Sequence, residues 1–250
     1  MKTNQELNSL ALRARRLLGE DSYSPIDVFA VVNGWGQYKI TVVRYPFSPN
    51  ISGMCTKEGE DVIIAVNSGS SYGRQRFTLA HELYHVLFDK GQTRVICDMS
   101  MGEDKPEVER EADLFASYFL MPYDALHQYA ESKEGWSIND VIEAEQFYQV
   151  SHQAMLFRLK LDGYITREQE NEYKNITVSR IAARLGYGGE LYYPVSEGKR
   201  YFTTGEYIRK VERLAGANKI SAGKREELLL DAFRADIVYN FDEEDVGLND

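Results

Sequence analysis

A short motif, His-Glu-x-x-His, constrains this chain more than any other feature of its sequence. It comprises His81, Glu82 and His85, inside the run FTLAHELYHVLF at residues 77–88. Residues four apart lie one turn apart on the same face of a helix, so the two imidazoles can converge on one metal ion. Glu82 then lies beside the metal, where a carboxylate can accept a proton from a metal-bound water. The motif therefore predicts a helix that carries two ligands and one base of a zinc site.

The residues around the motif favour this interpretation over a chance match. Apolar side chains occupy positions 77, 79, 80, 83, 86, 87 and 88, so the helix is expected to be buried. Ionisable groups are rarely buried without a partner. A buried helix with two histidines and a glutamate therefore needs a compensating positive charge, and a metal ion supplies it.

A catalytic zinc ion needs a third protein ligand and an open position for water. The downstream candidates are carboxylates and histidines: Glu103, Asp104, Glu107, Glu109, Glu111, Asp113, His127 and His152. The helix expected at residues 106–120 places Glu109 and Asp113 along one edge of its apolar side and Glu111 towards solvent, which makes Glu109 the preferred ligand. Because Glu109 and Asp113 lie one turn apart, one can bind the metal while the other accepts the ring N–H of a ligand histidine.

Hydrophobic periodicity predicts an α+β fold that is mostly helical. Two helices, at residues 4–19 and 25–32, precede β-rich runs at residues 38–45, 51–56 and 62–66. Their short connections predict a three-stranded antiparallel sheet, which would pack against the motif helix. The run 51–56 is either an ordinary sheet strand or an edge strand that pairs with an extended substrate. Further helices are predicted at residues 138–147, 151–161, 178–185, 205–216 and 223–235.

Composition argues against several classes of protein. The net charge of -10 disfavours general binding to nucleic-acid phosphates, and no apolar run is long enough to span a membrane. The sequence has two cysteines, Cys55 and Cys97, without the spacing of a thiolate metal site. This usage favours a reducing, cytoplasmic setting. The basic cluster Arg13, Arg15 and Arg16 is interpreted as a solvated helix face.

A second segment makes the likeness to a known family specific. His81-Glu82-x-x-His85 is followed by Glu109-x-x-x-Asp113 and then by FASYFLMP at residues 115–122. Together these segments resemble the ImmA/IrrE family of zinc metallopeptidases, and the ligand pattern is similar to that of thermolysin-like gluzincins. The resemblance extends over about residues 7–165. One departure is Tyr84, where family members often carry a small residue between the histidines.

The resemblance implies an intracellular zinc endopeptidase of mobile elements or stress responses, which cleaves a helix-turn-helix transcriptional repressor and so relieves repression. It implies one catalytic Zn²⁺ held by His81, His85 and Glu109, with Glu82 as general base and Asp113 bound to His81. The zinc metallopeptidase domain would occupy residues 1–165. Residues 175–250 would form a C-terminal helical or mixed domain of unknown role. The expected partner is a protein substrate, with no membrane and no direct nucleic acid.

Two other functions remain open. The chain could be a non-catalytic, zinc-containing regulator that binds a protein partner, although an intact Glu82 favours an enzyme. It could also be a DNA-binding regulator, because residues 150–164 resemble part of a helix-turn-helix, but their weakly basic surroundings favour a structural helix. The donor that would stabilise an oxyanion is not identified by the sequence, and Tyr118, His127 and His152 are candidates for it.

Overall fold

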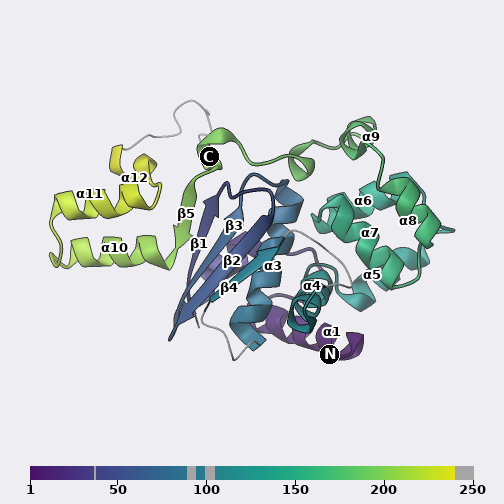
Figure 1. Cartoon of the computed structure of the whole chain (residues 1–250), viewed down its shortest axis with the longest axis horizontal. Helices are drawn as coiled ribbons and strands as arrows, with labels where there is room; N and C mark the ends of the chain where they lie inside the picture. Colours follow the sequence, from purple (N-terminus) through teal and green to yellow (C-terminus); the bar gives the residue numbers. More distant parts are fainter. Residues whose placement is uncertain (37, 89–93, 99–104, 240–250) are drawn as a thin grey trace.

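The fold is mostly helical with one small mixed sheet, and it belongs to the expected α+β class (Figure 1). A computed structural model describes residues 1–36, 38–88, 94–98 and 105–239, with the backbone alone for residues 94–98. The candidates Glu103 and Asp104 lie outside the described residues, as does the side chain of Cys97. Within the described ranges, no helix is long and apolar enough to cross a membrane.

The sheet has five strands in the order β4-β2-β3-β1-β5. Their bounds are β1 Lys39–Tyr45, β2 Ile51–Glu58, β3 Asp61–Asn67, β4 Arg94–Asp98 and β5 Phe202–Gly205. β2 pairs antiparallel with both β3 and β4, β1 pairs parallel with β3, and β5 pairs antiparallel with β1. β-branched residues of β1 and β3, such as Ile40, Val42, Ile64 and Val66, are buried in the core.

The expectation of a three-stranded antiparallel sheet is wrong in both strand number and direction. β3 lies between β1 and β2, so the connection at residues 46–50 joins strands that are not neighbours. Asn67, at the end of β3, stabilises this arrangement because its side-chain amide donates to the carbonyls of Ser48 (3.2 Å) and Ile51 (2.7 Å). The connection therefore passes over the end of β3. Consecutive strands usually pair, but here this contact leaves room for a strand between them.

Helices joined by turns and loops make up most of the described molecule outside the sheet. The first four are α1 Asn4–Leu17, α2 Val28–Gly34, α3 Tyr72–Phe88 and α4 Glu107–Leu120. Those that follow are α5 Tyr123–Glu131, α6 Ile138–Tyr148, α7 His152–Leu161, α8 Arg167–Tyr173, α9 Val178–Arg184, η1 Glu190–Tyr192, η2 Glu197–Lys199, α10 Glu206–Gly216, α11 Ala222–Asp231 and α12 Ala235–Tyr239. α3 packs against β2, β3 and α4, and α4 also packs against α1. In Figure 1, α5–α8 gather on one side of this central layer, and α10–α12 lie on the opposite side.

The sequence expectations do not include β4, β5, α5, α8, α12 and the two short helices η1 and η2. α8 lies between the two domains expected at residues 1–165 and 175–250, and Thr166 caps it by accepting from the backbone N–H of Gln169 at 3.2 Å. β5 belongs to the C-terminal range 175–250, yet it pairs with β1. The division into domains at 1–165 and 175–250 stays a prediction.

Two buried arginines anchor the C-terminal end of α4. Arg15 donates to the carbonyl of Phe119 (2.6 Å), and Arg158 donates to the carbonyls of Ser117 (3.2 Å) and Met121 (2.6 Å). Both guanidinium groups satisfy carbonyls at the helix end and oppose the negative end of the helix dipole. The assignment of Arg15 to a solvated face is wrong, because α1 packs on α4 and leaves Arg15 0% exposed.

Candidate metal centre

α3 carries the His-Glu-x-x-His motif through the core of the molecule, between the sheet and α4. Leu79 and Leu83 are fully buried on this helix. His81 and His85 are each only 4% exposed, and Glu82 is fully buried. Burial of the apolar side chains of α3 thus places three ionisable groups in the core, as the sequence predicts.

The two histidines and Glu109 of α4 converge on one point. The Nε2 atoms of His81 and His85 lie 3.3 Å apart, and they lie 3.2 Å and 3.4 Å from the two carboxylate oxygens of Glu109. Ligands at roughly 2.0–2.1 Å from a tetrahedral zinc ion lie about 3.3–3.4 Å from one another. The three donors therefore have the spacing of ligands that share one ion. Two imidazoles and one carboxylate also suit zinc chemically.

Electrostatics at this point favour a bound cation. Burial disfavours charge on His81, but hydrogen bonds with Asp113 and Glu109 raise the pKa of its imidazole to about 10. Burial likewise opposes charge on Glu109, yet the hydrogen bond with His81 lowers the pKa of that carboxyl below its ordinary value. The carboxylates thus stabilise positive charge on the imidazole side of the site, and a divalent ion can supply it in place of a proton.

Asp113 holds His81 on the side away from Glu109. Its Oδ1 lies 2.8 Å from Nδ1 of His81, while Nε2 of the same ring faces Glu109. Such a contact fixes the tautomer of a ligand histidine. Oδ2 of Asp113 accepts a hydrogen bond from Nζ of Lys105 at 3.0 Å. Lys105 is absent from the sequence-derived candidates. The one sequence feature that could have indicated Lys105 is its spacing, because Lys105, Glu109 and Asp113 follow one another at intervals of four residues.

Glu82 lies where Gly53 lets β2 approach α3 closely. A Cβ added at Gly53 would lie 3.2 Å from Oε1 of Glu82, 2.6 Å from Cγ2 of Thr78 and 2.8 Å from the carbonyl oxygen of Ala65. Glycine is therefore needed at this position of β2, because a side chain would meet both the helix and the neighbouring strand. The result is a buried carboxylate adjacent in sequence to His81. Its role as a base stays a prediction.

Glu111 is the competing carboxylate on α4. The expectation that it faces solvent is wrong. It is 5% exposed, and its Oε2 accepts hydrogen bonds from Nζ of Lys2 (2.6 Å) and from the hydroxyl of Tyr84. Burial opposes the charge of Glu111, but the hydrogen bonds from Lys2 and Tyr84 lower its pKa to about 2. Glu111 therefore ties α3 and α4 to the start of the chain. The contact also gives Tyr84, the residue unusual for the family, a structural role.

The remaining candidates for oxyanion stabilisation have other partners. His152 is bound through both ring nitrogens, to a carboxylate of α6 and a carbonyl of α8. His127 is exposed and shares a hydrogen bond of 2.8 Å with the hydroxyl of Tyr164. Tyr118 is buried, with the guanidinium of Arg158 4.3 Å from its ring centroid. The contacts of these three residues do not link them to the motif histidines.

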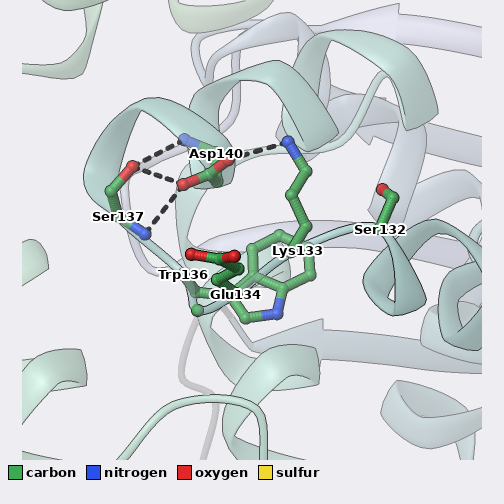
Figure 2. Close-up of a pocket in the computed structure, with 7 residues that line it drawn as sticks. Ser132, Lys133, Glu134, Trp136, Ser137 and Asp140 are labelled. Carbon is green, nitrogen blue, oxygen red and sulfur yellow. Dashed lines mark hydrogen bonds and ion pairs between the residues drawn. The ribbon is translucent and has the colours of Figure 1, made fainter.

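A surface hollow near the start of α6 offers no comparable set of ligands (Figure 2). It has a volume of about 580 Å³ and is lined by residues 132–137 and Asp140. Asp140 is bound to Nζ of Lys133 at 2.7 Å and to Ser137, whose backbone N–H and hydroxyl both contact it (Figure 2). These polar groups cap α6 and pair with each other, so we assign no ligand to this hollow.

Comparison with known proteins places the site in a family. A solved structure of a Mycobacterium tuberculosis transcriptional regulator matches this chain with 18% sequence identity and a TM-score of 0.43. The match covers 62% of this chain and 46% of the regulator. The chain therefore spans less than half of that regulator's length. No curated protein matches. The model of the IrrE N-terminal-like domain, a peptidase family, matches residues 36–160, half of the chain, including α3 and α4. The chain belongs to the family that carries this IrrE N-terminal-like domain.

Proposed function

We propose that this protein is a zinc-dependent endopeptidase. The observation that carries the proposal is the convergence of two imidazole nitrogens and one carboxylate at separations of 3.2 to 3.4 Å, with Glu82 on the same helix. Structural zinc sites use four protein ligands, whereas the described residues bring three donors together here. Three ligands leave a position for water, which a hydrolase needs. Membership of the IrrE-like family agrees with this proposal.

His81, His85 and Glu109 would hold the ion, which when bound acidifies a water molecule and polarises a peptide carbonyl. Glu82 accepts the proton of the attacking water and passes it to the leaving amine. Its carboxylate is fully buried on the same helix as the two motif histidines. Asp113 retains the Nδ1 proton of His81, so that Nε2 presents a lone pair to the ligand position.

We place the substrate along β4. β2, the edge strand suggested by the sequence, lies between β3 and β4 and has both of its edges paired. Among the described strands, β4 is paired on one edge, by β2, which itself packs against α3. An extended peptide can add to such an edge through main-chain hydrogen bonds.

The substrate that we propose is a helix-turn-helix transcriptional repressor, cleaved inside the cell to relieve repression. This identity rests on the family resemblance. A DNA-binding role has less support, because α7, which lies within the helix-turn-helix-like sequence, buries Arg158 together with Met155 and Leu159. A recognition helix needs its side chains exposed to reach base edges.

The test compares the zinc-loaded parent with Glu82→Gln, using a helix-turn-helix repressor encoded beside this protein and a mixed peptide library as substrates. We expect Glu82→Gln to retain zinc and to lose roughly 10²–10⁴-fold in cleavage rate, the usual contribution of a general base. The matched control, Glu131→Gln, changes an exposed carboxylate on α5 and should cleave like the parent.

Two results would overturn the proposal. Cleavage by Glu82→Gln at the parent rate would remove Glu82 as the base. If the parent binds the repressor without cutting it, and Glu82→Gln binds it equally, the protein is a zinc-containing regulator that acts by association.

A further inference from the structure

A chain of three contacts runs from the ligand position to a lysine that no motif includes. Nε2 of His81 faces Glu109 at 3.2 Å, Nδ1 of the same ring contacts Asp113 at 2.8 Å, and Nζ of Lys105 contacts the other oxygen of Asp113 at 3.0 Å. The side chains of Lys105 and Asp113 are each only 9% exposed. Both oxygens of the carboxylate are therefore engaged, one by the ligand histidine and one by the ammonium.

Among the residues that the structure describes here, the charges balance when Lys105 is counted. Three carboxylates surround the histidines, on Glu82, Glu109 and Asp113. With neutral imidazoles and one ammonium, two negative charges remain, and a single divalent cation neutralises them. A buried group of charges is stable only when it is paired in this way.

The position of Lys105 in the chain argues that it serves the site rather than the helix. It immediately precedes Pro106, the N-cap residue of α4. The N-terminal end of a helix carries partial positive charge and disfavours a cation. Lys105 therefore works against the dipole of α4, and the contact with Asp113 is the interaction that compensates.

We propose that Lys105 is a positioning residue of the metal centre: it holds Asp113 in the rotamer that orients His81 towards the ion. Without the ammonium, Oδ2 of Asp113 is a buried acceptor that has lost its partner, and the carboxylate can rotate away from Nδ1. His81 then loses its fixed tautomer. The inference deepens the proposed function, since it concerns how the same site holds zinc.

The experiment measures zinc affinity by competition with a chelator, together with the unfolding midpoint of the zinc-free protein. We expect Lys105→Met to weaken zinc binding by about 10–100-fold, the usual effect of losing a group that supports a ligand histidine. Lys105→Arg keeps the charge and the donors and should bind within about threefold of the parent. The cobalt-substituted protein should show a changed visible spectrum in Lys105→Met only.

Lys133→Met is the matched control. Lys133 also forms a partly buried pair, with Asp140 at 2.7 Å, but it lies in the connection between α5 and α6, outside the metal centre. Losing it should lower stability and leave zinc affinity unchanged. A purely structural role for Lys105 predicts the same outcome for Lys105→Met, and that outcome would overturn the inference.

A second arm separates positioning from direct charge repulsion. If Lys105 acts through Asp113, Lys105→Met should have little further effect on zinc affinity in an Asp113→Asn background. If Lys105 acts directly on the ion, its removal should tighten zinc binding in both backgrounds, which contradicts the inference. Failure of the parent to bind zinc would overturn the proposed function itself. Normal zinc binding by Lys105→Met, with an active parent, would overturn only the role of Lys105.

Discussion

Two largely buried clusters of histidine and carboxylate lie in the part of the chain that the structure describes, and they use the same groups differently. In the metal centre, the Nε2 atoms of two histidines face each other and the carboxylate of Glu109. In the other cluster, which we call the α6–α7 pair, His152 contacts Glu145 through Nδ1 at 2.6 Å. Its Nε2 donates to the backbone carbonyl of Tyr173 at 3.0 Å.

The difference lies in the hydrogen-bond partners of the ring nitrogens. In the α6–α7 pair, both ring nitrogens of His152 already have a protein acceptor. A backbone carbonyl only accepts, so Nε2 of His152 carries a proton. The second carboxylate oxygen of Glu145 accepts from the hydroxyl of Tyr192 at 3.0 Å. The α6–α7 pair is thus complete without an ion. Two Nε2 atoms 3.3 Å apart beside a carboxylate, by contrast, present converging acceptors, which is the arrangement that a cation completes.

Removing a carboxylate from the α6–α7 pair should have the largest effect on folding. Glu145 is 0% exposed, and Glu145→Ala leaves the partly buried His152 without its charge partner. We expect the free energy of unfolding to fall by about 3–5 kcal/mol, with zinc affinity unchanged. Denaturant titration and chelator competition measure the two quantities. A loss of zinc affinity in this variant would show that the two clusters are not independent.

The same substitution in the metal centre should have the opposite profile. We expect Glu109→Ala to weaken zinc binding by more than about 100-fold, the upper limit for groups that only support a ligand. The zinc-free protein should unfold at a modestly lower midpoint than the parent, because the substitution also removes the contact between Glu109 and His81.

Glu111→Ala is the control for this prediction. It removes the acceptor of Lys2 and Tyr84 on the same helix, so it should lower stability while zinc affinity stays within tenfold of the parent. Parent-like zinc binding by Glu109→Ala would remove Glu109 as a ligand.

The α6–α7 pair should also make stability depend on pH. Burial opposes charge on His152, but the hydrogen bond with Glu145 raises the pKa of its imidazole above the ordinary value. Burial raises the pKa of the Glu145 carboxyl as well. In both cases the folded state binds protons more tightly. The stabilisation from His152 is therefore complete below its unfolded pKa of about 6.5 and is lost as pH rises through the folded value.

The measurement is the free energy of unfolding of the parent and of His152→Phe, compared between pH 6 and pH 9. We expect the parent to lose about 1.4 kcal/mol more than the variant for each unit by which the pKa is raised. Equal slopes for the two proteins would contradict the role of this histidine.

Local periodicity explains what the sequence could predict. The pairs His81 and His85, and Glu109 and Asp113, are each four residues apart on helices, so their common direction follows from the helix repeat alone. The helices α1, α3, α4, α6 and α7 were predictable for the same reason. Joining α3 to α4 at the metal centre required a ligand count and a family resemblance in addition.

Long-range contacts explain what the sequence could not predict. Glu111 lies on the side of α4 that periodicity assigns to solvent, but Lys2, 109 residues away, covers it. β5 pairs with a strand far earlier in the chain, so no local pattern placed it in the sheet. Lys105 lies in an irregular stretch before α4, where no helical repeat indicates which way a side chain points.

The central claim is that the two motif histidines and Glu109 hold one zinc ion, and the zinc X-ray absorption spectrum of the loaded protein tests it most directly. We predict one zinc ion per chain, with two imidazole nitrogens and oxygen ligands at roughly 2.0–2.1 Å and no sulfur. One imidazole should disappear from the spectrum of His85→Ala. A sulfur ligand, or a spectrum unchanged by His85→Ala, would contradict the account.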